Sequence, residues 1–358
     1  MDGRKIRMVD EMRPIERFHA VMEKNPVDRI PVAPVTQTGT VDLMEASGAY
    51  WPEAHKDAEK MVKLGWAAYE VAGLEGVRIP FYIYAEAEAC GAELTKWKKD
   101  NHPVLKKAAV STLEDIDRLE VPDPHRDGRM PQILEATRIL APRCRKEKIP
   151  LILTVIGPTA LSLNAGMTDS MYSMVWFKRN PEEMEKLMRK CLEIGLVYAE
   201  ALIDAGADTI LYNGAFDAGI APADYEKMPL RYNREGVRKI KELGAYVIYH
   251  SCMDIRRVFP HLLKLEAHAI SLSQEMDMAE ARAIAGEDTV LAGNVDPTYT
   301  LIKKSPEEVI EECKYCIDAG SDILCPGCGF GPKTPLENMK AMVEAGKKYG
   351  HNARLAKR

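Results

Sequence analysis

The sequence predicts a (β/α)8 barrel, a fold in which eight parallel strands alternate with helices. Short apolar runs bounded by turn residues, helical patterns between most of them, and polar side chains where several runs end all support it. An open doubly wound sheet is the alternative, but no Gly-x-Gly-x-x-Gly motif follows an early strand. We expect residues 1–358 to form one barrel domain, with an N-terminal helical extension and a long excursion after the second strand.

The elements follow from the spacing of apolar residues. Strands are predicted near residues 32, 76, 152, 209, 247, 270, 290 and 323. Helices are predicted from residue 13 onward and at 56–72, 113–119, 131–147, 181–204, 223–243, 256–265, 278–285 and 306–318. A closing helix begins at Thr334, where Thr334 and Glu337 have the spacing of a capping box. Two prolines in 29–35 favour a strand end, and the polar stretch 90–130 forms the excursion with only one short helix.

The composition excludes several classes of protein. The chain has 358 residues, 46% of them hydrophobic, and a net charge of −5, so it can bury a large core and offers no basic surface for nucleic acid. No apolar run reaches the roughly 18 residues that a membrane span needs. The 8 cysteines are too dispersed for the disulfide framework of a small secreted protein. We therefore expect a cytoplasmic protein with reduced thiols that binds neither nucleic acid nor membranes.

Two metal-ligating side chains follow one predicted strand. His250 and Cys252 close the apolar run 245–248, and residues two apart in a strand point to the same face. An imidazole and a thiolate are both good zinc ligands. In a parallel barrel, the chemistry lies at the carboxyl ends of the strands. The pair therefore predicts half of a metal site at the mouth of the barrel.

A second strand end offers the remaining ligand. The strand near residue 323 runs into a loop that carries Cys325 and Cys328. If one of them binds, the site has three protein ligands and an open position, as in catalytic zinc sites; if both bind, the site is closed and structural. The barrel mouth favours the open site. Cys328 can turn inward after a glycine, while Cys325 is equally compatible with a buried strand position; Cys313 and Cys316 are expected on a packed helix face.

The ligand set indicates the chemistry. Two thiolates and a neutral imidazole cancel the charge of Zn²⁺, which makes such a zinc a poor generator of hydroxide. Sulfur ligands suit zinc, so the open position favours another thiol and lowers the pKa of that thiol from about 8.5. The bound sulfur stays nucleophilic because the whole site is then anionic. Alkyl transfer to a thiol is therefore favoured over hydrolysis.

Several motifs together resemble one family, the methylcobalamin:coenzyme M methyltransferases of the uroporphyrinogen decarboxylase superfamily. The resemblance covers nearly the whole chain. The segments that carry it are Pro34–Gly39, Trp51–His55, His250-x-Cys252, Pro326–Gly329 and Lys333–Asn338.

The resemblance implies a fold, a site and a reaction. The fold of this superfamily is a (β/α)8 barrel, and the family's zinc ligands fall on His250, Cys252 and Cys328, which decides against Cys325. A small corrinoid protein presents methyl-Co(III), and a zinc-bound coenzyme M thiolate attacks the methyl carbon. The products are methyl-coenzyme M, as in methanogenesis, and a Co(I) corrinoid. A related enzyme with another methyl acceptor stays open.

Other polar residues near strand ends are candidates for substrate and cofactor contacts. The family carries acidic residues after the sixth strand, where this chain has Ser273 and Gln274, and only Glu275 is acidic. We take Gln37 and Glu275 as candidate catalytic residues. The candidates for cofactor contacts are Thr36, Thr38, Asn213 and Asn294. The alternative for the first cluster is that Thr38 or Thr40 caps a helix.

Two other functions are compatible with the barrel. Uroporphyrinogen decarboxylation needs no metal but requires arginines near the first strand to hold many carboxylates, and residues 32–38 contain none. A non-catalytic corrinoid-binding or zinc-storage barrel is the third possibility. Measured zinc content, followed by turnover with methylcobalamin and a thiol, distinguishes the three.

Overall fold

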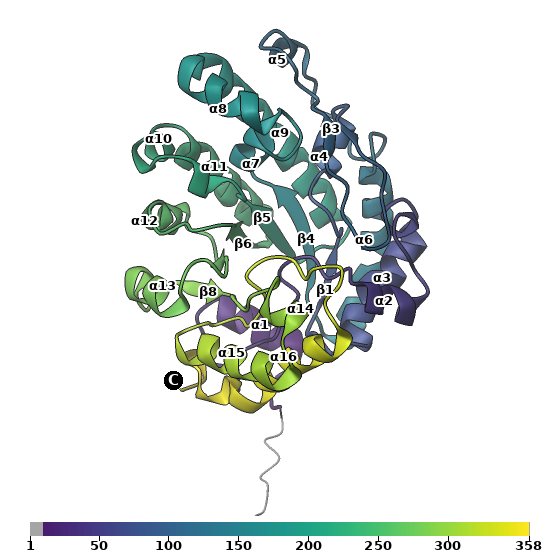
Figure 1. Ribbon diagram of the computed structural model, residues 1–358, viewed down its shortest axis with the longest axis vertical. Coiled ribbons are helices and arrows are strands. Elements are labelled where there is room, and N and C mark those ends of the chain that lie inside the picture. The colour runs from purple at the N-terminus through teal and green to yellow at the C-terminus, as the bar shows by residue number, and fades with distance from the viewer. Residues whose placement is uncertain (1–9, 358) are drawn as a thin grey trace, which may run out of the picture.

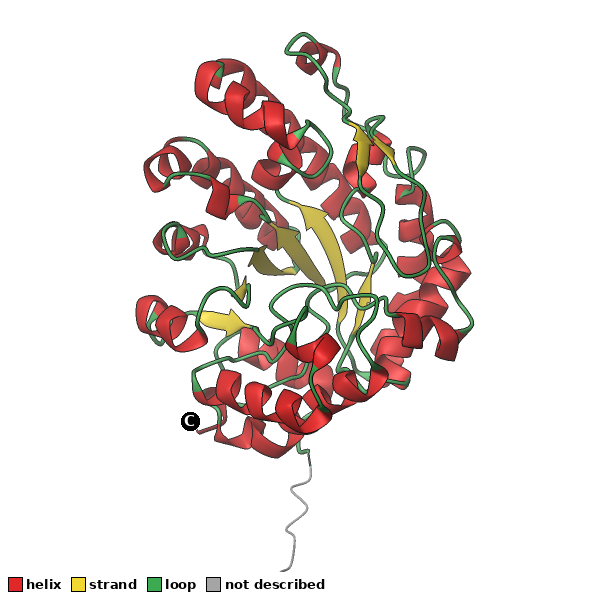
Figure 2. Cartoon of the chain, in the orientation of Figure 1, coloured by secondary structure: helices red, strands yellow, loops and turns green. Residues whose placement is uncertain are grey.

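The computed structural model describes residues 10–357 and contains a parallel sheet surrounded by helices (Figures 1 and 2). The sheet strands pair in the order β1, β4, β5, β6, β7, β8. Their bounds are β1 Val77–Ile79, β4 Leu151–Ile156, β5 Thr209–Asn213, β6 Tyr246–Ser251, β7 Ala269–Leu272 and β8 Val290–Ala292. Each pair is parallel, which agrees with the helical crossovers between the strands.

The helices cover the outside of the sheet. In chain order they are α1 Pro14–Met22, α2 Val41–Ser47, α3 Ala58–Glu70, α4 Ala85–Ala89, α5 Asp115–Arg118, α6 Met130–Glu147, α7 Pro158–Leu163, α8 Ser170–Arg179, α9 Pro181–Asp204, α10 Pro222–Lys227, α11 Pro229–Glu242, α12 Phe259–Leu262, α13 Met278–Ala285, α14 Thr300–Lys303, α15 Pro306–Asp318 and α16 Leu336–Tyr349. Within residues 10–357, no helix combines the length and apolarity that a bilayer crossing requires.

Two short bridges close the sheet into a barrel. Val32 pairs with Leu324, and Ile323 pairs with Ala292 at the end of β8. On the other side, the Glu75 amide donates to the Val32 carbonyl at 2.9 Å, next to β1. The predicted fold class is confirmed, but the strand predicted near 32 shrinks to a single bridge, and the strand predicted near 323 shrinks to isolated bridges at Ile323, Leu324 and Pro326. Prolines flank Val32 on both sides of its bridge, and proline cannot donate to a ladder.

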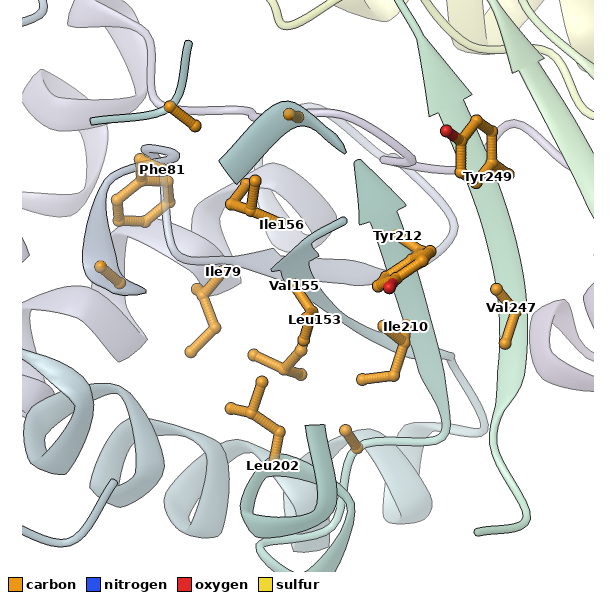
Figure 3. Close-up of a cluster of buried hydrophobic side chains, with 14 of the residues drawn as sticks. Ile79, Phe81, Leu153, Val155, Ile156, Leu202, Ile210, Tyr212, Val247 and Tyr249 are labelled. Carbon is orange, nitrogen blue, oxygen red and sulfur yellow. The ribbon is translucent and has the colours of Figure 1, made fainter. Parts of the chain in front are cut away.

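The core has two layers because alternate strand residues face opposite sides. Outward-facing side chains such as Leu153, Ile210 and Val247 pack against helices, as Figure 3 shows with Leu202 of α9. Inward-facing side chains fill the barrel; they include Ile152, Leu211, Ile248, Ala269, Val290 and Ile323. His250 lies two residues after Ile248 in β6, so its side chain faces the barrel interior as well.

Several predicted elements differ from the structure. The helix expected at 223–243 breaks at Met228, because Pro229 starts α11 and cannot continue α10. The capping box at Thr334 does not form: Pro335 is the N-cap, and Asp42 accepts from the Leu336 amide at 2.8 Å instead. The excursion holds α5 as the one helix between residues 90 and 129, as predicted, but it also forms a hairpin of β2 Glu93–Leu94 and β3 Leu105–Lys107 that was not predicted.

A buried ion network anchors the closure beside β1. The Glu75 carboxylate accepts from the Arg17 guanidinium at 3.0 Å, from Arg29, and from the Val32 amide at 2.9 Å. Arg17 also pairs with Asp28 at 2.7 Å. One carboxylate therefore holds α1, the Val32 segment and the start of β1 together.

Replacing Glu75 by alanine should destabilise the fold strongly. The change leaves two buried guanidinium groups without their shared counter-ion, a loss of about 3 kcal/mol or more. Urea denaturation followed by circular dichroism measures it. Glu93→Ala is the matched control, because Glu93 is an exposed partner of Lys106 and its loss should leave the urea midpoint nearly unchanged. Equal midpoints for the two variants would contradict this role of Glu75.

Candidate metal centre

Three potential metal ligands meet at the carboxyl end of the barrel. His250 is the second-last residue of β6, Cys252 directly follows the strand, and Cys328 comes from the loop after the Leu324 bridge. The ligand atoms of the three side chains all lie within 4.8 Å of one another. The Nε2 atom of His250 lies 3.1 Å from the Cys252 sulfur, which lies 3.7 Å from the Cys328 sulfur.

These distances fit a tetrahedral zinc ion. Zinc–sulfur bonds of about 2.3 Å in tetrahedral geometry place two sulfur ligands about 3.8 Å apart. The observed separation of the Cys252 and Cys328 sulfurs is 3.7 Å. A sulfur and an imidazole nitrogen on the same ion would lie about 3.6 Å apart, so His250 and Cys252 need to separate by about 0.5 Å. The three residues can therefore hold zinc and leave a fourth position open.

The imidazole of His250 is already oriented. Its Nδ1 atom lies 3.0 Å from the Ser271 hydroxyl on β7, and its Nε2 atom faces the cysteines. With the proton on Nδ1 donated to Ser271, the lone pair of Nε2 is free for a metal. This arrangement of an outer hydrogen bond that fixes the tautomer is typical of histidine ligands.

The two cysteines share a hydrogen bond that divides their charge unequally. The bond to Cys328, together with burial, raises the pKa of the Cys252 thiol. The same bond lowers the pKa of Cys328 well below its usual value, against the effect of burial. With Cys252 as the donor of this bond, Cys328 carries the negative charge of the pair.

A buried polar network supports the end of β6. The Tyr249 hydroxyl donates to Asp217 at 2.8 Å, and the Asn233 amide donates to Tyr249 at 2.9 Å. Burial raises the pKa of Asp217 to about 7. Because Tyr249 precedes His250 in the strand, this network fixes the backbone that carries the first ligand.

The three ligands line a cavity of about 280 Å³. Most of its wall is apolar, with Phe81, Leu211 and Phe330 among its members. Of the residues predicted to contact substrate or cofactor, Thr36, Gln37 and Asn213 line the cavity. A mainly apolar cavity with a few converging polar groups is the usual form of a small-molecule site.

Thr36 and Gln37 also fix the loop that carries Cys328. The Thr36 hydroxyl donates to the Cys328 carbonyl at 2.6 Å. The Gln37 amide donates to the Phe330 carbonyl and accepts from the Gly39 amide at 2.8 Å. Both ends of Gln37 are thus used within the protein, which gives it a positioning role.

Three predicted residues lie away from the cavity wall. Thr38 is fully buried, and the helix cap is Thr40, which accepts from the Leu43 amide at 3.3 Å. The Asn294 amide donates to the Ser273 and Met276 carbonyls at 2.9 and 2.6 Å, so it stabilises the loop after β7. Glu275 is exposed, and its side chain does not line the cavity.

The other cysteines considered as ligands are buried elsewhere. Cys325 packs in the barrel interior, where burial raises the pKa of its thiol. Cys313 and Cys316 lie on the buried face of α15. Of the two cysteines in the loop, only Cys328 approaches His250 and Cys252.

Sequence reasoning missed Arg78, Tyr82 and His102 as cavity residues. Arg78 is a charged residue inside the apolar strand β1, and that contrast is a signal that the sequence does contain. The rings of Tyr82 and His102 stack with centroids 5.2 Å apart at an interplanar angle of 11°, although twenty positions separate them in the irregular segment after β1. The path of an irregular segment leaves no periodic signal, so the sequence could not have paired them.

Comparison with known proteins assigns the chain to a family. The model of the uroporphyrinogen decarboxylase (URO-D) family matches residues 13–349. The chain belongs to the uroporphyrinogen decarboxylase family. The solved structure of a methyltransferase from Methanosarcina mazei superposes on it with a TM-score of 0.89 at 28% identity, covering 95% of this chain and 99% of that one.

Within the uroporphyrinogen decarboxylase family, the chain is similar to named methyltransferases. It is 36% identical over 345 residues to methylcobamide:CoM methyltransferase MtbA of Methanosarcina acetivorans, covering 95% of this chain and 99% of MtbA. It is 32% identical to MtaA of Methanosarcina barkeri, covering 93% and 97%. A uroporphyrinogen decarboxylase of Geobacter metallireducens is 28% identical, covering 92% and 97%.

The hydrogen bond between the cysteines predicts selective alkylation of the metal-free protein. At pH 7, below the usual thiol pKa of about 8.5, Cys328 should react with iodoacetamide ahead of the buried Cys325, because the lowered pKa keeps Cys328 as thiolate. Peptide mass spectrometry after treatment with a chelator measures the rates.

Two variants test the origin of this reactivity. Cys252→Ala removes the donated hydrogen bond and should slow alkylation of Cys328 at pH 7, whereas Cys252→Ser keeps a donor and should retain most of the rate. If Cys328 reacts equally fast in both variants, the pair does not share its charge in the way described.

Proposed function

We propose that the protein transfers a methyl group from a methylcobamide, presented by a small corrinoid protein, to the thiol of coenzyme M or a similar small thiol. In this proposal, His250, Cys252 and Cys328 hold a zinc ion. The observation that supports it most directly is the meeting of these three ligand atoms within 4.8 Å beside a small cavity. The names of the similar proteins MtbA and MtaA support the choice of methylcobamide and coenzyme M.

The residues of the centre suit this transfer. When bound, zinc supplies a Lewis acid that keeps a coordinated thiol as thiolate at neutral pH. The sulfur–carbon bond forms as the cobalt–carbon bond breaks, and the electron pair of that bond stays on cobalt, which changes from Co(III) to Co(I). Two cysteine thiolates keep the acceptor sulfur electron-rich. His250 offers its Nε2 lone pair to the metal and donates its Nδ1 proton to Ser271. Because neither nitrogen can then accept the proton of the thiol, that proton goes to solvent.

The cavity wall contributes by excluding water. Phe81, Leu211 and Phe330 surround the open side of the ligand set with apolar surface. A thiolate that loses part of its hydration shell is a stronger nucleophile toward a methyl carbon. The combination of soft ligands and an apolar wall therefore supports a reaction that uses both.

The lining of this cavity suits the decarboxylation of uroporphyrinogen less well than methyl transfer. That reaction requires several cations to hold many carboxylates, and Arg78 is the one arginine that lines the cavity within residues 10–357. The ligand set would also have no role in a reaction that uses no metal. We therefore favour methyl transfer.

Metal analysis tests the proposed ligands. We expect about one zinc per chain, and Cys252→Ala or Cys328→Ala should lose most of it, because two ligands hold zinc much less tightly than three. Ser271→Ala should weaken zinc binding about 10- to 100-fold through the orientation of His250. Cys325→Ala is the matched control and should keep its metal. Full zinc occupancy in Cys328→Ala would exclude this site.

The pH dependence of turnover tests thiol activation. At saturating thiol, transfer from free methylcobalamin should stay nearly constant from about pH 8 to pH 7, although the free thiolate falls about tenfold. Binding of the thiol should release a proton, since it arrives protonated and ends as thiolate. At lower pH the ligands protonate, and zinc and activity should be lost together. A rate that follows the free thiolate, without proton release, would show that the metal is structural.

A further inference from the structure

Arg78 is a buried arginine that has no carboxylate partner in the described part of the chain. Arg17, Arg29 and Arg78 are all among the largest fully buried side chains of the protein. Arg17 and Arg29 each pair with carboxylates, including the shared Glu75. Within residues 10–357, no ion pair to Arg78 is found, so its positive charge is not neutralised by a neighbouring acid.

Arg78 faces the interior of the barrel. Its strand neighbours Val77 and Ile79 point outward, since both lie against Gly65 of α3. Its two terminal nitrogens donate to the Pro80 carbonyl and to the Thr154 hydroxyl on β4. These bonds fix the plane of the guanidinium, and its Nε atom is buried without any partner in the described chain.

The guanidinium reaches the same cavity as the metal ligands. Arg78, His250, Cys252 and Cys328 all line it, and the Cys328 charge acts on the pKa of Arg78. His102 lies on the same wall, where burial and the charge of Arg78 lower its pKa to about 4. His102 is therefore neutral, and Arg78 is the cation of the cavity.

A buried charge is costly unless an opposite charge or hydrogen-bond acceptors compensate it. A site made of Zn²⁺, two thiolates and a neutral imidazole has no net charge, so it cannot neutralise the positive charge of Arg78. The planar guanidinium matches the geometry of carboxylate and other oxyanions. The missing partner of Arg78 is thus expected to arrive with the substrate.

We propose that Arg78 binds the anionic group of the thiol acceptor. The substrate class is then a short thiol that carries a sulfonate or a carboxylate, with its sulfur at the metal ligands and its oxyanion at Arg78. This inference rests on the proposed methyl transfer, and it adds the residue that selects the acceptor.

Acceptor selectivity tests the inference. Transfer from methylcobalamin is measured with 2-mercaptoethanesulfonate, 3-mercaptopropionate and the neutral 2-mercaptoethanol. In the unmodified protein, kcat/KM should favour an anionic thiol. In Arg78→Met, the ratio of kcat/KM for that thiol over 2-mercaptoethanol should fall at least about tenfold, as expected for loss of a charged hydrogen bond. Arg78→Lys should restore part of the ratio, and the sulfonate and carboxylate arms identify which oxyanion fits.

Two controls separate recognition from folding. Arg189→Met removes an exposed arginine that pairs with Glu235 on the outer helices and should keep the full ratio. Zinc content and urea denaturation of Arg78→Met show whether the site and fold persist; loss of an unpaired buried charge should leave stability equal or higher. If Arg78→Met lowers transfer to all three thiols by the same factor, Arg78 only offsets the cysteine charge, and the inference is wrong.

A binding measurement separates this inference from the proposed function. Calorimetry with 2-hydroxyethanesulfonate, which has no thiol, should show binding to the unmodified protein and at least about tenfold weaker binding to Arg78→Met. Binding that depends on Arg78, without methyl transfer to any thiol, would support the anion site and overturn the transfer. Methyl transfer whose acceptor selectivity is unchanged in Arg78→Met would overturn the anion site alone.

Discussion

The closure of the barrel between Val32 and Leu324 is the contact on which both fold and site depend. Cys328 lies 76 residues beyond Cys252 in the chain, and it reaches the first two ligands only because the Leu324 segment returns beside Val32. The bridge itself is short, since prolines limit its ladder. The Glu75 carboxylate makes up for the short ladder, because it accepts from the Val32 amide and pairs with two buried arginines. These contacts lie at the end of the barrel opposite the site.

The distribution of buried charge separates stability from function. At the amino-terminal end, Arg17 and Arg29 are fully matched by acids, and such a network holds elements in place. At the carboxyl-terminal end, Arg78 pairs with no acid among residues 10–357, and the two site cysteines share a proton. Groups left incompletely compensated reduce stability unless a ligand completes them. The paired charges at the amino-terminal end therefore stabilise the fold, and the incompletely paired groups at the carboxyl-terminal end are available to bind a ligand.

The regular part of the fold could be predicted from sequence, and so could the first two ligands. Apolar runs give the strands from β4 to β8, and the two-residue repeat alone places His250 and Cys252 on one face. Asn294 was selected because it follows a strand, and Glu275 because the resembled family carries acidic residues there; the loops direct both side chains away from the cavity. The choice of Cys328 over Cys325 depended on a resemblance, since strand parity does not extend into a loop.

The loop that carries Cys328 is placed by packing on both sides rather than by a strand. A side chain at Gly327 would overlap the backbone of Gln274, and one at Gly329 would overlap the side chain of Gln37. Glycine at both positions lets the loop pass between its neighbours, and the Thr36 hydroxyl then fixes the Cys328 carbonyl. The third ligand is thus held before any metal arrives, so binding costs little ordering of the chain. The His250–Cys252 spacing has to widen for zinc, and both residues lie at the carboxyl end of β6.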